Sequence, residues 1–161
     1  MSTLSNLHGR IASFHLHPGE RGAPLTSTDI IELEAERGIR GDARYFGRRS
    51  RSTGGPTKRQ VTLIEREILQ RHADALGLAA IAPGIARSNI ETEGIDLSAS
   101  VGRRLRLGTA VLEVVEPREP CEKMEAIAPG LRALMTPPCQ GVIARVIESG
   151  TAKIGDAVEL L

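Results

Sequence analysis

Two stretches decide the fold of this chain: RRLRLGTAVLEVVEP at residues 103–117 and GVIARVIESGTAKIGDAVELL at residues 141–161. Both stretches alternate apolar with polar residues and are divided by Gly108, Gly150 and Gly155, a pattern typical of short β-strands joined by turns. Working outward, residues 10–16, 24–33 and 85–98 are further strand-like runs bounded by Gly or Pro. Many short strands without a regular strand–helix rhythm predict a mostly β protein, a closed or nearly closed β-barrel with a few short helices.

Residues 60–78, QVTLIEREILQRHADALGL, predict a strand that continues directly into a helix. The stretch opens with β-branched residues, and Ile64, Ile68, Leu69 and Leu76 then recur at helical spacing. Gly77 stands where a helix ends. We therefore expect the longest helix near residues 65–76 and two shorter helical turns within residues 122–135, which Pro and Gly interrupt.

The composition fits one domain spanning residues 1–161, because 40% of the residues are hydrophobic and 25% are charged. With 21 Lys+Arg against 20 Asp+Glu, the net charge of +1 provides no general field for gripping nucleic acid. Aromatic residues make up 2% of the chain, too few for the base-stacking platforms of single-strand binders. We therefore expect no nucleic-acid partner.

Apolar runs are also short. None approaches the roughly 20 residues that span a bilayer, and residues 1–13 lack the apolar block of a secretory leader. We therefore expect no membrane partner and a cytoplasmic location. In that reducing compartment a disulfide between Cys121 and Cys139 is not expected.

Residues 37–60 form a basic segment with eight Lys and Arg and one acid, and Gly, Ser, Thr and Pro are concentrated in residues 47–57. Such a composition predicts a mobile loop. Just after it, Arg59 and Gln60 precede a buried strand, and Thr62 shares a strand face with Gln60. These three residues either close over an anionic group together with the loop or belong to a solvated segment.

Cys121, in PREPCEKM, is the strongest candidate for chemistry. The neighbouring cations Arg118 and Lys123 and the start of a helix favour a thiolate, which serves as a nucleophile or a metal ligand. The alternative is a small cysteine that only packs. Cys139, at the entrance to a strand, is expected to be such a packing residue.

The run ARSNIETEG, residues 86–94, predicts a second constellation. Strand alternation places Arg87 and Asn89 on one face, where a guanidinium fork and an amide suit a phosphate or carboxylate. The alternative is a solvated edge strand with Glu91 and Glu93 as surface charges. His15 and His17 also share a strand face, as a weak metal pair or as polar surface. The motifs GxxxxGK[ST], GxGxxG, HExxH and CxxC are absent.

Taken in order, five segments of the chain resemble the motifs of the MOSC domain, the C-terminal domain of molybdenum-cofactor sulfurases. They are GIRGDARYFG, RQVTLIEREIL, PGIARSNIETEGIDLSASVGRRLRLGTAVLEV, PREPCEKM and QGVIARVIESGTAKIGDAVEL, which together run from about residue 37 to residue 161. The resemblance implies a stand-alone bacterial protein with a mostly β barrel similar to that of pyruvate kinase.

The resemblance also implies a cofactor and a set of residues around it. Cys121 matches the family's cysteine, which carries sulfane sulfur or ligates molybdenum, and Arg87 and Asn89 match its R-x-N segment near the pterin and phosphate of the molybdenum cofactor (molybdopterin). Arg59, Gln60, Thr62 and Lys123 are the further cofactor-binding candidates. Pyridoxal phosphate is associated only with the family's larger members, whose aminotransferase-like domain finds no match here.

Two uses of such a site remain open: sulfur or cofactor transfer, as a sulfur carrier, and molybdenum-dependent reduction of N-hydroxylated compounds. The first use implies a cysteine-desulfurase partner and the second a redox partner. The rival interpretation is a non-catalytic binding module that docks on a partner enzyme through its basic loop.

Overall fold

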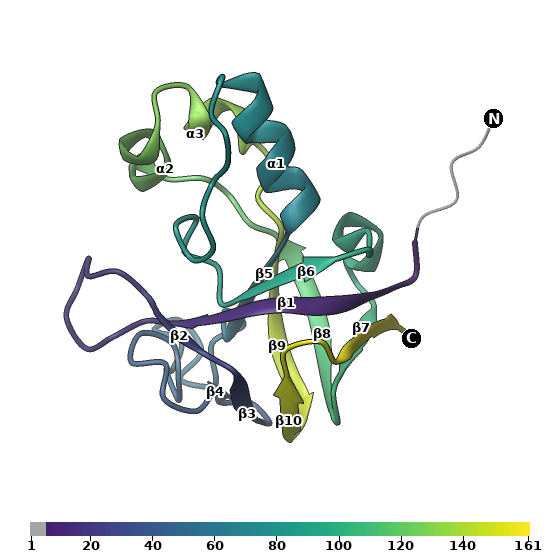
Figure 1. Cartoon of the computed structure of the whole chain (residues 1–161). Helices are drawn as coiled ribbons and strands as arrows, with labels where there is room; N and C mark the ends of the chain where they lie inside the picture. Colours follow the sequence, from purple (N-terminus) through teal and green to yellow (C-terminus); the bar gives the residue numbers. More distant parts are fainter. Residues whose placement is uncertain (1–5) are drawn as a thin grey trace.

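Seven strands of the computed structural model, which describes residues 6–161, close into a barrel (Figure 1). In order around the barrel they are β1 (His8–Leu16), β11 (Ala157–Leu160), β7 (Arg104–Leu107), β8 (Ala110–Pro117), β9 (Val142–Glu148), β5 (Val61–Glu65) and β6 (Ile90–Glu93). The long strand β1 closes the ring because its first part pairs with β11 and its centre with β6. The mostly β barrel predicted from the sequence is confirmed.

Four shorter strands lie outside this ring. β2 (Thr26–Thr28) pairs with the end of β1, and β10 (Gly150–Lys153), β3 (Ile30–Glu34) and β4 (Gly38–Ile39) form a separate three-stranded sheet. The single strand-like run at residues 24–33 is therefore divided between two sheets. The small sheet carries the chain into the basic segment.

The helices lie together on one side of the barrel, at the top of Figure 1. They are α1 (Arg66–Ala75), which follows β5 without a break, α2 (Glu122–Ile127) and α3 (Leu131–Leu134), with a short 3-10 turn at Leu97–Ser100 elsewhere. The longest helix is the one the sequence predicts. Within residues 6–161 no helix combines the length and apolar character that a membrane crossing requires.

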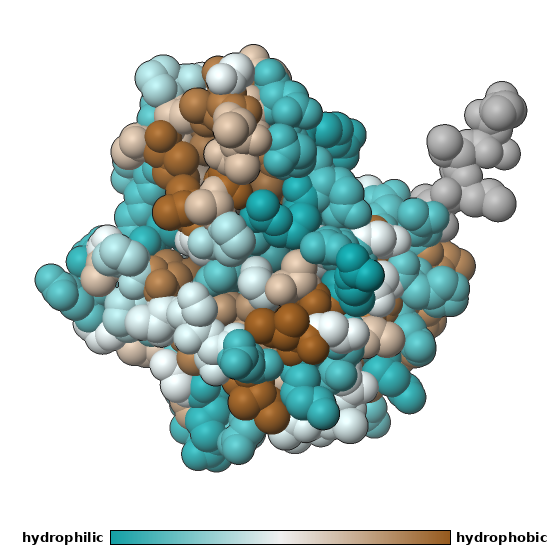
Figure 2. All heavy atoms as spheres, viewed as in Figure 1, coloured by the Kyte–Doolittle hydropathy of each residue, from teal (hydrophilic) through white to brown (hydrophobic). Residues whose placement is uncertain are grey.

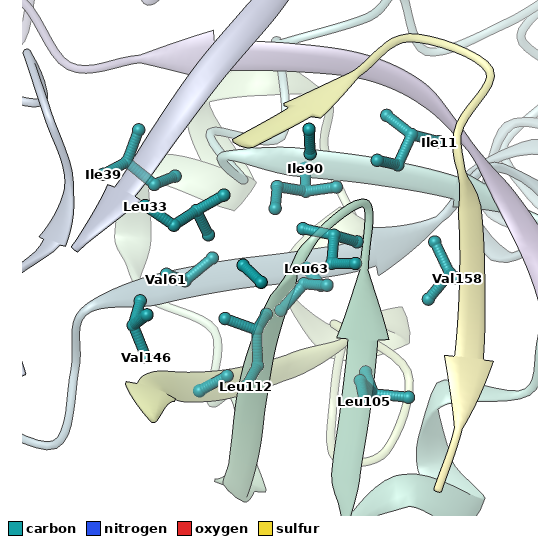
Figure 3. Close-up of a cluster of buried hydrophobic side chains, with 14 of the residues drawn as sticks. Ile11, Leu33, Ile39, Val61, Leu63, Ile90, Leu105, Leu112, Val146 and Val158 are labelled. Atoms are coloured by element: carbon teal, nitrogen blue, oxygen red, sulfur yellow. The ribbon is translucent and has the colours of Figure 1, made fainter. Parts of the chain in front are cut away.

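The core is mostly aliphatic, with Phe14 as its aromatic member, and it fills the barrel and the space beneath the small sheet. Figure 3 shows side chains from many strands directed toward one another, among them Leu33, Leu63, Ile90 and Leu112. A second cluster, including Ile64, Leu69, Met124, Leu131 and Met135, packs the three helices together. Gly141 enters β9 at a φ of +75°, and a Cβ there would collide with the backbone of Leu63. Only glycine lets the strands approach so closely.

The strand predicted around residues 85–98 is shorter than expected, and this changes the face that Arg87 presents. β6 begins only at Ile90, and Arg87 lies before it with a φ of +62°. The prediction that Arg87 and Asn89 share a strand face is therefore wrong. Glu91 is buried rather than a surface charge, because β6 lies between β5 and β1 inside the sheet.

Candidate functional site

Cys121 lies in the turn between β8 and α2 and is half-buried. It is close to the buried guanidinium of Arg118. Burial, followed by repulsion from Arg59, lowers the pKa of Arg118 to about 10, and Tyr45 and Cys121 oppose this shift. The end of β8 with Arg118, the basic segment with Tyr45 and Arg59, and the turn with Cys121 therefore meet at one place.

Two of these guanidinium groups have buried donors without acceptors. Arg118 donates from Nη1 to the Ser88 Oγ at 2.9 Å, but its Nε has no hydrogen-bond partner in the described chain. The Nε of Arg59 is likewise buried without a hydrogen-bond partner in the described chain. The guanidinium of Arg59 lies 5.4 Å from the centre of the Tyr45 ring. Buried donors are nearly always satisfied in native proteins, so these two are available to an acceptor such as an ordered water or a ligand atom.

Lys123 connects Cys121 to a wider group of cations. Partial desolvation, followed by repulsion from Arg44 and Arg87, lowers the pKa of Lys123, whereas Cys121 opposes the shift. Repulsion of this kind is strong only between charges that lie near one another. Cys121 thus lies near Arg118 and Lys123, and these two cations in turn lie near Arg44, Arg59 and Arg87.

A cavity of about 460 Å³, which we call the cationic cavity, is lined by Arg44 and Arg87, the two arginines near Lys123, whereas Lys123 and Cys121 themselves lie outside its wall. Its wall carries five arginines, Arg21, Arg44, Arg48, Arg51 and Arg87, and one carboxylate, Glu20. Between residues 6 and 161, none of the five arginines forms an ion pair. Other arginines of the basic segment, Arg37 and Arg40, pair with glutamates elsewhere. The cationic cavity is therefore suited to a polyanionic ligand.

Asp42 holds the arginine-bearing loop against β1. Its carboxylate accepts hydrogen bonds from the backbone and ring of His17, from the backbone of Arg44 and Tyr45, and from the amide of Asn89. Burial alone would raise the pKa of Asp42, but hydrogen bonds, chiefly those from His17, outweigh burial and lower it. An ionised Asp42 thus fixes the start of the loop that carries Arg44 and Arg48.

Arg87 occupies the left-handed region that non-glycine residues rarely adopt. Its Nη1 donates to the carbonyl oxygen of Ala23 at 3.1 Å, which holds the side chain at the cavity wall. Strained backbone of this kind costs of order 1–3 kcal/mol and clusters at functional sites. The conformation of Arg87 is consistent with a functional position.

Three of the sequence candidates lie behind the site. Asn89, Thr62 and Gln60 are buried, and their side chains bond to one another or to the backbone. Asn89 donates to the carbonyl of His15 and to Asp42, and it accepts from Thr62. The structure thus brings Cys121, Lys123, Arg59 and Arg87 together and places the other three as supports.

Sequence reasoning missed His17, Asp42 and Tyr45 as parts of this arrangement. The signal was the GIRGD turn, in which an aspartate follows two glycines. The ring of His17 contacts Asp42 and that of His15 contacts the Ser13 Oγ at 2.8 Å, so the two rings have separate partners. Both histidines are buried, so the interpretation of this pair as polar surface is wrong. Over residues 6–161 no group of three or more His, Cys, Asp or Glu side chains is arranged to hold a metal ion.

Cys139 lies in the turn that leads into β9, at the entrance to a strand as expected. It is half-buried, and its carbonyl oxygen contacts the Nε2 of His72 at 2.8 Å. The turn contains the proline pair Pro137 and Pro138, which have no N–H to donate to a sheet. Both cysteines are free thiols, as expected.

Comparison with known proteins shows the family and the fold. The family model of the MOSC domain matches residues 46–159. The crystal structure of YuaD from Bacillus subtilis is similar, with 19% identity, coverage of 96% of each chain and a TM-score of 0.77. YiiM from Escherichia coli has 22% identity over 94% of this chain and 69% of its own, with a TM-score of 0.64. YiiM from Geobacillus stearothermophilus has 19% identity over 95% and 75%, with a TM-score of 0.67. A comparison with curated proteins gave no match.

Proposed function

This chain belongs to the MOSC domain family, and from that premise we propose that it holds the molybdenum cofactor in the cationic cavity, with Cys121 as the thiolate beside it. The observation that carries the proposal is the set of five arginines without ion pairs around the cavity. Since none of these five arginines is used in an ion pair of the described chain, their charges are available to a ligand with a phosphate group.

The residues present fit such a cofactor in chemical type. Phosphate oxygens would accept hydrogen bonds from Arg44, Arg48 and Arg51 in the cavity wall. The orphaned Nε donors of Arg59 and Arg118 lie on the Cys121 side and would bind further oxygen or sulfur acceptors. A thiolate suits both molybdenum and sulfane sulfur, because both are soft partners.

When bound, the cofactor would supply a metal that exchanges electrons or receives sulfur. The protein's own part is to place Cys121 beside the positive charges of Arg118 and Lys123, which attract an anionic ligand toward its sulfur. Asn89, Thr62 and Gln60 position the binding arginines by holding Asp42 and the start of β5 in place. Sulfur or cofactor transfer and reduction of N-hydroxylated compounds are the two uses we propose.

The rival function, docking on a partner enzyme through the basic loop, would leave the loop's arginines on the outer surface. Arg44, Arg48 and Arg51 are indeed exposed, but they also line the cationic cavity. Their convergence on one cavity favours a small anionic ligand, and the pterin measurement below distinguishes it from docking.

The decisive experiment is to measure molybdenum and pterin in protein purified under reducing, anaerobic conditions from a host that makes the cofactor. We expect near-equimolar pterin in the wild type, loss of molybdenum in Cys121→Ser and retention in the matched variant Cys139→Ser. Retained molybdenum with little sulfane sulfur indicates reduction, and sulfane sulfur on Cys121 without molybdenum indicates transfer. A wild-type protein without pterin, or full retention of molybdenum and sulfur in Cys121→Ser, would remove the proposal.

A further inference from the structure

A second cavity, of about 390 Å³, adjoins the cationic cavity and shares Gly22 and Arg87 with it. We call it the apolar cavity, because much of its wall is aliphatic or proline. These residues are Pro24, Leu25, Pro83, Ile85, Ala126 and Ile127. They come from the segment before β2, the turn before β6 and helix α2, and Figure 2 shows hydrophobic side chains gathered over the lobe that holds α2 and α3.

Ile85 has no role in either hydrophobic core. It is 46% exposed and belongs to neither of the two buried clusters. Large aliphatic side chains that are exposed in a concave wall typically contact a ligand. The volume of the apolar cavity also lies within the range of roughly 300–1,000 Å³ that small-molecule sites occupy.

His15 supplies a polar group to this aliphatic wall. Its Nε2 lies 2.8 Å from the Ser13 Oγ, and its Nδ1 makes no hydrogen bond within residues 6–161. A Cβ on Gly84 would lie 2.7 Å from that Nδ1, so the ring packs closely against this glycine, and His15, only 3% exposed, contributes to the cavity wall. Burial lowers the pKa of His15, although Glu91 opposes the shift. The imidazole is therefore neutral at neutral pH and offers one hydrogen-bonding atom rather than a charge.

Two cations complete the cavity wall. Arg87 and Lys123 both line it, and among the described residues neither forms an ion pair. An aliphatic wall with two unpaired positive groups is complementary to a molecule that has an apolar body and one acidic group.

We propose that the apolar cavity binds a small organic acid, with its apolar body against Ile85 and Ile127 and its acidic group toward Arg87 and Lys123. Because Lys123 lies two positions from Cys121 in the chain and interacts with it electrostatically, the bound acid would lie near that cysteine. Its identification as the substrate of the site rests on the proposed function, whereas the binding itself does not require the cofactor.

The test uses 2-naphthoate as the probe and the neutral 2-naphthamide as its uncharged counterpart. The chain has no Trp, one Tyr and two Phe, so nuclear Overhauser effects from the naphthalene protons to protein methyl groups are easily resolved. We expect such effects to the methyl groups of Ile85 and Ile127, and calorimetry gives the dissociation constants. Ile85→Glu should weaken naphthoate binding at least tenfold. The control Ile154→Glu, at a site 45% exposed and outside the cavity, should leave it unchanged.

The acidic group is tested with Lys123→Met, which should weaken naphthoate several-fold and leave naphthamide unchanged. Equal effects of the two isoleucine variants would overturn the location, and naphthamide binding as tightly as naphthoate would overturn the acidic class. Pterin retention is measured on the same Ile85→Glu protein. If the wild type contains no pterin but binds naphthoate normally, the proposed function is wrong and the organic-acid site stands. If the wild type contains pterin but does not bind naphthoate, only the organic-acid site is wrong.

Discussion

The Nδ1 atom of His17 lies 2.8 Å from the Oδ2 atom of Asp42, and the backbone N–H of His17 donates to the same oxygen at 2.9 Å. This double contact joins β1 to the turn that starts the arginine-bearing loop. His17 also lines the cationic cavity, so the contact ties the barrel wall directly to the site.

Asp42→Asn should therefore lower both stability and anion binding. The amide would present a donor to groups that are themselves donors, and we expect a loss of about 3 kcal/mol in the free energy of unfolding at pH 7. Since folding lowers the pKa of Asp42, the carboxylate's contribution is present above its ordinary value and is lost as pH falls. Denaturant titrations should show that the free energies of unfolding of the wild type and of Asp42→Asn become equal at acidic pH. The control Asp29→Asn, at an exposed residue, should change little, and an equal effect would contradict the role of Asp42.

Glu65→Gln should stabilise the protein at alkaline pH. Burial, followed by repulsion from Asp96 and Glu67, raises the pKa of Glu65 to about 7, and its Oε1 has no partner among residues 6–161. Between the ordinary value of 4.5 and 7 the folded state binds more protons than the unfolded state, so wild-type stability falls as pH rises through this window.

Glu65→Gln has no titrating carboxyl group at this position, so its stability does not fall in this pH window. We expect it to be more stable than the wild type by up to about 3 kcal/mol at pH 8, with no gain at pH 4. Thermal unfolding across this range measures the difference. Glu148→Gln, at an exposed carboxylate, serves as the control. A gain for Glu65→Gln that is the same at both pH values would disprove the buried carboxylate as its cause.

Cys121 should react with iodoacetamide at least tenfold faster than Cys139 at pH 7. Both thiols are half-buried, so their electrostatic surroundings decide the rates. Cys121 lies near Arg118 and Lys123, whereas Cys139 shares a surface cavity with three acids, Glu65, Glu67 and Asp96, and one cation, Arg71. Positive neighbours favour the reactive thiolate and negative neighbours disfavour it. Peptide mass spectrometry over time gives both rates, and similar rates would contradict this assignment.

Arg51→Ala should weaken pyrophosphate binding about five- to tenfold, whereas Arg49→Ala should change it less than twofold. The two arginines belong to the same loop, but Arg51 lines the cationic cavity and Arg49 donates to the carbonyl oxygen of Gly54 at 3.0 Å. Charge-assisted contacts to phosphate account for the difference, and added salt should reduce it. Calorimetry measures both variants. Equal losses would mean that the loop acts only through its total charge.

The loop at residues 47–57 should also become resistant to subtilisin when pyrophosphate is bound. In the structure it is held by hydrogen bonds such as that from the Ser50 N–H to the Gly55 carbonyl and by a bridge between Arg49 and Pro56. A bound anion would join Arg48 and Arg51 and so restrain the loop further. Cleavage at the same rate with and without pyrophosphate would disprove closure over the ligand.

The sequence by itself determined the architecture and the central cysteine as a candidate. Alternation in residues 103–117 and 141–161 predicts β7 to β11 except for the exact strand ends, because period-two burial is a local property of a strand. The helical spacing after Val61 likewise predicts α1. Cys121 stood out because its nearest cations, Arg118 and Lys123, are its neighbours in the chain.

Only the tertiary structure decided which polar residues face the site. Asn89 and Thr62 were equal candidates with Arg87 and Arg59, but barrel closure turns the first pair into the interior and leaves the second pair near the cavity. The backbone of Arg87 leaves the strand conformation just before β6, which no alternation pattern reveals. The pairing of His17 with Asp42 joins residues 25 positions apart, and it exists only because β1 and the loop after β4 meet when the ring of strands closes.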